Sequence, residues 1–362
     1  MIEETVTVTA GGRRYSRWES VTVTAGAEQA ARAFAIVTAE PDQAFGDDWV
    51  FKPGTAVEIY AGSDLLLKGY VDEYDPQFSD TQHTATITGR SKSKDAIDSS
   101  AVHPTGELRD KTLKDIAADL DKFGIGFAAN VDLKSIPVHR IVPGATMFEE
   151  LEVLARAQGL LLVGEADGSV MITRAGESGR HAGGLIEGVN IKEASASLSE
   201  RNKHSKVTAR GQKSSGTGKG ALRLEHEAED GSVERYRPLI VPVEGDTDQG
   251  RVQQRADWHV ARSAGLSTRA SILTSGWRDR DGALWDPKKL VYVESRKLKI
   301  AQDMAISSVT FEQQNQMGTT SRLQLVDPRA LGGKNPKGKS NGAWSAPSPP
   351  PAAPSWALEP GA

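Results

Sequence analysis

The strongest constraint on the fold of this sequence is a period-two alternation of β-branched and polar residues near its N-terminus. Thr5–Thr9 reads Thr-Val-Thr-Val-Thr, and Ser20–Thr24 reads Ser-Val-Thr-Val-Thr. Such alternation places every second side chain on one face and predicts half-buried strands. Gly11–Arg14 lies between them with turn chemistry, so the two segments are expected to begin a hairpin or a meander. The hexapeptide Val-Thr-Val-Thr-Ala-Gly occurs in both segments, and similar strands of one sheet explain it better than a solenoid repeat.

Further short segments of strand character continue to about residue 90. Gly, Pro and Asp residues separate them, and these residues favour turns. Many short strands with such punctuation predict a small antiparallel barrel or sandwich in this part of the chain. The additional strand candidates are Ala33–Thr38, Ala56–Tyr60, Leu65–Tyr74 and His83–Gly89.

The period of the apolar residues changes after the first hundred residues. Apolar side chains recur at helical spacing between Thr112 and Gly124, and again between Met147 and Gly159. The second helix leads into Leu160–Val163, a turn at Asp167–Gly168 and another apolar strand. A helix followed by a hairpin predicts a small α/β module, which we assign to residues 105–188.

Strand character returns after residue 189 and is interrupted by one helical stripe. We therefore assign a first β domain to residues 1–104, and a second to residues 189–331 with a helical insertion near 249–264. The strands predicted in the second β domain are Ile272–Trp277, Leu290–Val293, Met304–Phe311 and Thr320–Val326.

The last segment, residues 332–362, has a different composition from the rest. Gly, Lys, Asn and Ser are followed by a run of prolines from Pro347. Such a segment buries too little apolar surface to offset its ordering entropy, so we predict a Pro-rich flexible tail. Trp344, Trp356 and Leu358 are its large apolar residues and are candidate docking anchors.

Composition excludes several classes of protein. The sequence contains no cysteine, which rules out disulfides, thiolate nucleophiles and cysteine-held metals. No segment reaches the roughly 18 consecutive apolar residues of a membrane span, so we expect no stable membrane insertion. The acidic start Met1–Glu4 lacks the order of a signal peptide, which indicates that the protein is made in the cytoplasm. A net charge of −4 argues moderately against nucleic-acid binding.

Two motifs that suggest ligand chemistry fail on spacing. Gly211–Gly220 resembles a phosphate-binding loop, but Lys213 replaces the first glycine and Gly220 follows Lys219 where Ser or Thr is required. A flexible hairpin loop is the better interpretation. No two histidines have the His-x-x-x-His spacing that places two ligands on one helical face. The seven histidines are His83, His103, His139, His181, His204, His226 and His259.

The acidic residues Asp72, Glu73 and Asp75 are the remaining candidates for catalysis. A glycosidase needs two acids across a cleft, one of them with a raised pKa. Three acids near the end of a strand are more often a solvated edge that discourages aggregation. No Gly-x-Ser-x-Gly motif is present either. The sequence therefore indicates no catalytic, cofactor-binding or metal-binding residue, and we predict that the protein is not an enzyme.

Three segments, in this order and spacing, resemble the baseplate hub protein of Mu-like contractile-tailed phages. The resemblance extends over about residues 1–330, and its most specific part is Gly-Arg-Ser-Lys at the start of the first segment. The segments are Thr88–Ala101, Pro143–Leu162, and the run from Gly276-Trp277-Arg278 through Trp285 and Met304–Ile306 to Leu323–Pro328.

This resemblance implies a fold and a function. Such a hub is α+β but mainly β, with two similar antiparallel β-barrel domains and a small α/β module between them. Three chains form a homotrimeric ring that joins the tail tube, or other baseplate proteins, to the central spike protein. DNA passes through the ring without specific binding. The hub part of type VI secretion spike proteins has the same architecture, and the expected location is the tail baseplate of the virion, after assembly in the host cytoplasm.

The resemblance also gives the conspicuous residues structural roles. Gly89 and Gly144 are expected where the backbone must be permissive. Trp277 and Trp285 flank the turn Asp279–Gly282 and are expected to pack on each other or on a neighbour. Arg90 and Asp95 are candidates for a local ion pair. The alternative function is a baseplate-associated cell-wall hydrolase, which would need converging carboxylates or a zinc site, and a carbohydrate-binding β module is a third class.

Overall fold

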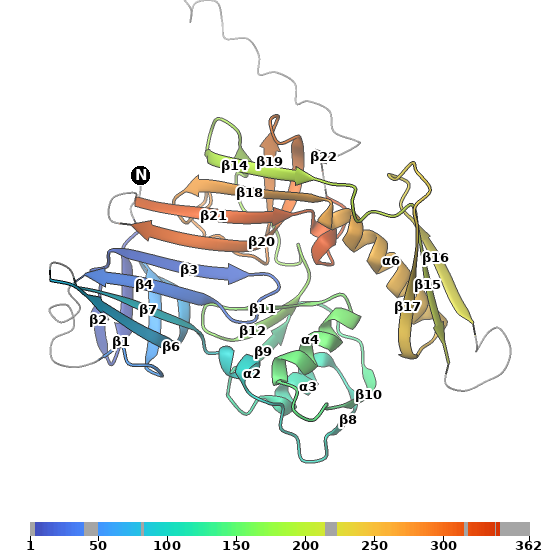
Figure 1. The fold of residues 1–362 in the computed structure, drawn as a ribbon, viewed down its shortest axis with the longest axis horizontal. Helices are drawn as coiled ribbons and strands as arrows, with labels where there is room; N and C mark the ends of the chain where they lie inside the picture. The colour runs from blue at the N-terminus through green and yellow to red at the C-terminus, as the bar shows by residue number, and fades with distance from the viewer. Residues whose placement is uncertain are drawn as a thin grey trace, which may run out of the picture.

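The computed structural model describes residues 4–39, 50–80, 83–213, 223–314, 318–336 and 338–340, and one 14-stranded sheet runs through most of it (Figure 1). The order of the main strands is β14-β18-β21-β20-β3-β4-β7-β6-β5-β1-β2. The N-terminal strands are β1 Val6–Ala10, β2 Arg13–Tyr15, β3 Ser20–Gly26, β4 Ala33–Ala39, β5 Ala56–Ala61, β6 Asp64–Phe78 and β7 His83–Ser91. The C-terminal strands are β13 Leu185–Ile186, β14 Ile191–Leu198, β18 Thr268–Ser275, β19 Leu290–Ser295, β20 Ile300–Gln314, β21 Gly318–Val326 and β22 Gly338–Ser340.

Two groups of five strands in this sheet have the same pairing order. The first strand set is β3-β4-β7-β6-β5, and the second strand set is β14-β18-β21-β20-β19, with every neighbouring pair antiparallel. In each set the fourth strand along the chain has 15 residues. Each of these long strands contains a bulge in the same ladder of its set. The bulge lies between Val71 and Glu73 in the ladder of β6 with β7, and between Ile306 and Ser308 in the ladder of β20 with β21. The two sets therefore share a topology.

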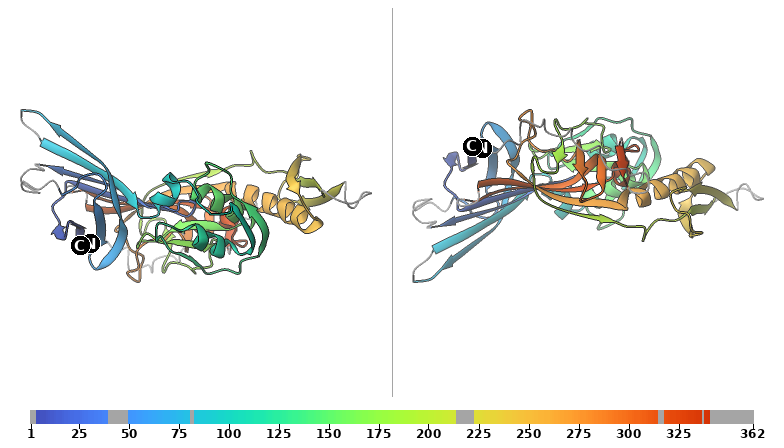
Figure 2. Two further views of the ribbon diagram at one scale, coloured as in Figure 1. Left: turned by 90° about the horizontal axis from the view of Figure 1, so that it is seen from below. Right: turned by 90° about the horizontal axis from the view of Figure 1, so that it is seen from above.

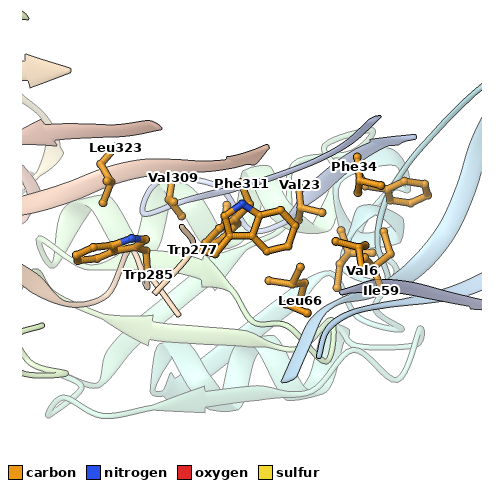
Figure 3. Packing of buried hydrophobic residues seen from close by; sticks show 14 of the residues in the cluster. Val6, Val23, Phe34, Ile59, Leu66, Trp277, Trp285, Val309, Phe311 and Leu323 are labelled. Atoms are coloured by element: carbon orange, nitrogen blue, oxygen red, sulfur yellow. The ribbon is translucent and has the colours of Figure 1, made fainter. Parts of the chain in front are cut away.

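The two strand sets are joined within the chain by β3 and β20. Their antiparallel ladder runs from Ser308 opposite Gly26 to Gln314 opposite Ser20. A single apolar core extends across this joint, with Val23 and Phe311 among its buried residues (Figure 3). The ladders of the described residues leave the sheet open at β14 and β2, so the predicted pair of similar β-barrels is not confirmed. The mainly β character of the α+β fold is confirmed.

The predicted pairing of the first two strands is wrong, although both strands form. β1 pairs with β2 and β5, and four other strands separate it from β3 in the sheet. Gly11 and Gly12 both have positive φ, at 55° and 75°, and Ala10 lies opposite Arg13. A two-residue turn of this kind closes a tight hairpin at once, so the chain folds back after Gly12 and not at residue 20.

The α/β module has its own apolar core and follows the predicted order of helix, helix and hairpin. Both predicted helices begin at a capping box, with Thr112 bonded to Asp115 and Thr146 bonded to Glu149. The short helix at residues 94–98 was not predicted. The elements are α2 Lys94–Asp98, β8 Glu107–Lys111, α3 Leu113–Leu120, β9 Phe127–Ala129, β10 Ile136–Arg140, α4 Met147–Ala157, β11 Leu161–Gly164 and β12 Val170–Thr173.

A three-stranded sheet and the longest helix are inserted between β14 and β18, the positions that β3 and β4 hold in the first strand set. The predicted helix near 249–264 is confirmed as α6, whose Val252 and Ala256 pack on this small sheet. The insertion and the β6–β7 hairpin lie at opposite ends of the molecule (Figure 2). The inserted elements are β15 Lys206–Gln212, β16 Leu224–Glu229, β17 Pro238–Asp246 and α6 Gln249–Leu266.

The beginning of the predicted Pro-rich tail contains ordered backbone. After the 3-10 helix η1, Pro328–Leu331, the chain returns to the sheet as β22 and pairs with Ile300–Gln302 of β20. β21 ends at Val326 and leaves this part of β20 without a second neighbour, so a strand can add there even though Gly338–Ser340 carries little β propensity. Trp344, Trp356 and Leu358 lie outside the described residues.

Candidate assembly surfaces

The three acidic residues do not converge on a cleft. Asp72 lies at the bulge of β6, where one carboxylate oxygen accepts a hydrogen bond from Arg90 Nε at 2.7 Å and the other contacts Lys94 Nζ. Burial raises the pKa of Asp72, but the bonds from Arg90 and Lys94 outweigh it, so the pKa lies below its ordinary value. Glu73 and Asp75 are exposed on β6. A lowered pKa does not suit the general acid of a glycosidase.

Arg90 pairs with other carboxylates than the one predicted. Its guanidinium donates to Asp98 at 2.6 and 3.0 Å as well as to Asp72. Asp95 lies in the first turn of α2, whereas Asp98 is its last residue. The Gly-Arg-Ser-Lys segment therefore fastens α2 to the sheet, and the predicted Arg90–Asp95 pair is wrong.

The two glycines singled out in the sequence are required for different reasons. A Cβ on Gly89 would lie 2.2 Å from the carbonyl oxygen of Tyr70 and 2.6 Å from the ring of Phe34, so the sheet has no room for a side chain there. Gly144 has φ of 92°, a conformation that L-residues rarely adopt. The prediction of permissive backbone is therefore confirmed at Gly144, whereas Gly89 has no positive φ and is required by the close approach of its neighbours.

Trp277 and Trp285 each pack against a different ring across the turn that joins them. Trp277 meets Phe311 edge-on with centroids 5.6 Å apart, and Trp285 meets His181 with centroids 4.8 Å apart. The backbone N–H of Trp285 donates to the carbonyl oxygen of Trp277 at 3.1 Å. The expectation of packing on a neighbour is confirmed, and both side chains belong to the same apolar core (Figure 3).

Asp279 of the same turn forms a buried carboxylate–imidazole pair with His181. His181 Nδ1 lies 2.9 Å from Asp279 Oδ2, and His181 Nε2 accepts a hydrogen bond from the backbone N–H of Asp286 at 3.0 Å. Because Nε2 accepts, Nδ1 carries the proton and donates to Asp279. The side chains of His181 and Asp279 are 0% and 4% exposed. This geometry leaves no face of the imidazole open to a substrate.

We expect Asp279→Asn to weaken the pH dependence of stability in acid. Burial raises the pKa of Asp279, but the hydrogen bonds from His181 and from the N–H groups of Ala182 and Ala283 outweigh it and lower the pKa. A lowered folded-state pKa adds stability that is complete above the unfolded value near pH 4 and declines as pH falls toward the folded value. Urea unfolding between pH 7 and pH 2.5 should show a smaller loss in Asp279→Asn than in the wild type, and equal losses would contradict the assignment.

The other candidates for ligand chemistry remain apart. Within the described residues no three His, Asp or Glu side chains are grouped as a metal would require. No helix of the described part is long and apolar enough to cross a membrane. Most of Gly211–Gly220 lies outside the described residues, but the strands on either side of it pair antiparallel, with Gly211 opposite Leu224.

A surface pocket of about 460 Å³ lies beside the β1–β2 turn and is lined by residues of β5 and β6. Its charged lining residues already have partners: Lys68 Nζ lies 2.8 Å from Glu58, and Lys92 donates to the carbonyl oxygen of Gly124 at 2.6 Å. No unpaired charge among them is available to hold an ionic cofactor.

One end of the large sheet is formed by the exposed strand β14. β14 pairs with β18 on one side, and its other side has no strand beside it among the described residues. Every residue from Lys192 to Leu198 is exposed, although the segment alternates Ala-Ser-Ala-Ser-Leu at its end. An open edge of this length offers a row of unpaired N–H and C=O groups to a partner strand.

A second open edge lies along the outer half of β6. Its first half pairs with β5, but β5 reaches only as far as Tyr70, while β7 pairs with β6 up to Phe78. From residue 73 to residue 78 the side of β6 away from β7 therefore faces no strand in the described part of the chain. Phe78 is 85% exposed there.

The sequence interpretation missed both edges. β14 carries a visible alternation of small apolar and polar residues, which predicts a strand, but nothing in the pattern says that it has one neighbour. Phe78 stands between Gln77 and Ser79, and an aromatic residue in such polar surroundings is the signal that was available.

Two like strand sets, with open edges at β14 and along the outer half of β6, are the main features of the described residues. Four family models match successive parts of the chain. They are described as Mu phage baseplate assembly protein GpP-like, N-terminal (residues 5–91), baseplate hub protein gp44-like, second domain (93–174), tail protein NMB1110-like, third domain (203–258), and Mu phage baseplate assembly protein GpP, fourth domain (248–333).

Individual relatives agree with these matches. The baseplate hub protein gp44 of Escherichia phage Mu is 28% identical over 339 residues, which cover 90% of this chain and 88% of that protein. The 43 kDa tail protein of prophage MuSo2 from Shewanella oneidensis is 31% identical, with a TM-score of 0.80 and coverage of 90% of this chain and 99% of that one. The chain belongs to the family of Mu-like phage baseplate hub and tail proteins.

The fold alone extends to more distant proteins. The tail protein from Neisseria meningitidis MC58 has a TM-score of 0.78 at 22% identity, over 91% of this chain and 98% of that one. A component of the type VI secretion system of E. coli has a TM-score of 0.56 at 10% identity, over 91% of this chain and 79% of that one. The predicted architectural relation to type VI secretion proteins is confirmed at the level of the fold.

Proposed function

We propose that this protein is the central hub of a contractile tail baseplate and that three copies form a closed ring. The observation that carries the proposal is the shared topology of the two strand sets, joined edge to edge through β3 and β20. One chain thus supplies two like units, and three chains supply six. A ring of this kind can meet a sixfold tail tube on one side and a threefold central spike on the other.

The hub has no catalytic task in this proposal. Asp72 is engaged by two cations, and the buried pair of His181 and Asp279 is closed by backbone hydrogen bonds. DNA would pass through the ring during ejection without specific binding, for which the net charge of −4 is suitable because a strongly basic channel would retain phosphates. The alternative, a baseplate-associated hydrolase, has no arrangement of described residues in its favour.

The test is the mass and the activity of one purified sample. Light scattering is expected to give about three times the chain mass of 38.8 kDa at micromolar concentration. The same sample is expected to leave peptidoglycan uncleared and to retain no duplex DNA at physiological salt. A stable monomer would contradict the ring, and peptidoglycan clearing lost in Asp72→Ala would contradict the structural role.

A further inference from the structure

The shared topology allows residues of the two strand sets to be matched one by one. The bulge fixes the match along the long strands, because Val71 and Ile306 each immediately precede it. Starting from these two residues, the directly opposite residue can be read in each successive strand, from β6 to β3 in the first strand set and from β20 to β14 in the second. The row in the first strand set is Val71, Gly89, Phe34 and Val23, and the row in the second is Ile306, Leu325, Ala270 and Ala196.

This match places the two open edges in the positions of the joint inside the chain. β14 corresponds to β3, with Ala196 in the place of Val23. The outer half of β6 corresponds to the outer half of β20. Pro76 takes the place of Phe311, because Pro76 lies five residues after Val71 and Phe311 lies five residues after Ile306. β3 and β20 are paired, with Val23 opposite Phe311. β14 and the outer half of β6 are separated by six strands in the sheet, and they do not pair with each other in the described part of the chain.

Resting on the ring proposed above, we propose that β14 of one subunit pairs antiparallel with residues 73–78 of β6 in a second copy of the chain. In this register Ala196 lies opposite Pro76, Leu198 opposite Tyr74 and Ala194 opposite Phe78. The contact repeats between subunits the joint that β3 and β20 make within one. Pro76 lacks an N–H group, so this residue cannot donate a hydrogen bond to the ladder.

The apolar side chains of the two open edges support this register. In the joint within the chain, one face carries Val21, Val23 and Ala25 of β3, which are at most 1% exposed. The matching residues of β14 are also apolar, yet all of them are exposed. Across the joint, the matching residues of β6 include Pro76, which is exposed, and Phe78, which is 85% exposed. The proposed pairing sets Phe78 opposite Ala194 and Pro76 opposite Ala196.

The opposite face of the two edges is polar in the same pattern. Within the chain, Thr310 lies opposite Thr24 and Glu312 opposite Thr22. In the proposed register, Asp75 lies opposite Ser197 and Gln77 opposite Ser195, so both pairs are again polar and each contains a hydroxyl. Cross-strand pairs of this type are compatible with a solvated face, whereas a shift by one residue would place Phe78 among the serines.

Paired cysteines test both the contact and its register, because the natural chain contains no cysteine. Gln77→Cys with Ser195→Cys places two thiols directly opposite each other, within reach of a disulfide. The control is Gln77→Cys with Ser197→Cys, on the same face but two residues out of register, where the diagonal separation of about 7 to 8 Å exceeds that reach. Under mild oxidation the first pair is expected to form covalent trimers at least about tenfold faster than the control.

The outcomes separate this inference from the ring itself. A covalent series that ends at three chains and collapses on reduction supports both. A mass of three chains with equally slow cross-linking of the two pairs overturns the strand pairing and leaves the ring standing. Cross-linked products that continue beyond three chains support the strand pairing and overturn the closed ring. A monomer of the unmodified protein, with no cross-linking, overturns both.

Discussion

Replacing Trp277 by alanine is expected to lower the free energy of unfolding by about 3 to 5 kcal/mol, the usual cost of removing a buried tryptophan. Trp277 is 0% exposed and packs edge-on against Phe311 (Figure 3). Phe311 lies opposite Val23 in the ladder that joins the two strand sets. Its indole Nε1 lies 3.2 Å from the carbonyl oxygen of Glu312 and 2.9 Å from that of Thr320. Urea unfolding followed by circular dichroism, at one protein concentration, measures the loss.

A pair of milder variants separates the hydrogen bonds of Trp277 from its volume. Trp285 is also buried, at 4%, but its Nε1 donates to no acceptor in the described part of the chain. Trp277→Phe and Trp285→Phe remove a similar volume. Trp277→Phe also removes the indole N–H that donates to the carbonyl oxygens of Glu312 and Thr320. Trp277→Phe is therefore expected to cost about 1 kcal/mol more than Trp285→Phe. Equal costs would show that Trp277 acts through packing alone.

The sequence predicts local structure well in this protein because local patterns determine it. The alternation in Ser20–Thr24, the helical stripe before Gly159 and the capping box at Thr146 each involve residues that are near in the chain. The neighbours of a strand in the sheet, in contrast, are not determined by local patterns. Val23 and Ala196 have comparable sequence surroundings, but one is buried against Phe311 and the other is exposed. The difference depends on a strand about 290 residues away, which no local pattern specifies.

The same limit explains the errors at individual residues. The sequence predicts a pair between Arg90 and the nearby Asp95, but the partners of Arg90 depend on how β6, β7 and α2 pack together. The role of Arg278 was not foreseen at all. It donates to Glu4 at 2.5 Å and to Asp64 at 2.6 Å, and so fastens the N-terminal strand to the turn after Trp277. Pairs that are more than 200 residues apart require the fold before they can be named.

Replacing Phe78 by aspartate is expected to convert the trimer to monomers at micromolar concentration. In the proposed contact each copy of Phe78 packs over Ala194 of the next chain, and burying a phenylalanine contributes about 2 kcal/mol. A loss of that size weakens each interface about thirtyfold. A closed ring of three contains three such interfaces, so its formation constant falls by about four orders of magnitude. Light scattering across a dilution series measures the change.

The matched control for this variant lies in the α/β module. Val153→Asp replaces an apolar side chain that is also exposed, at 61%, on α4, which lies away from both open edges (Figure 1). It loses an exposed apolar group and gains the same charge, so non-specific effects of the added charge should be similar in the two variants. Since Phe78 is exposed in the single chain, Phe78→Asp should keep the circular dichroism spectrum of the wild type. Dissociation by both variants, or by neither, would show that the outer half of β6 is not where the chains meet.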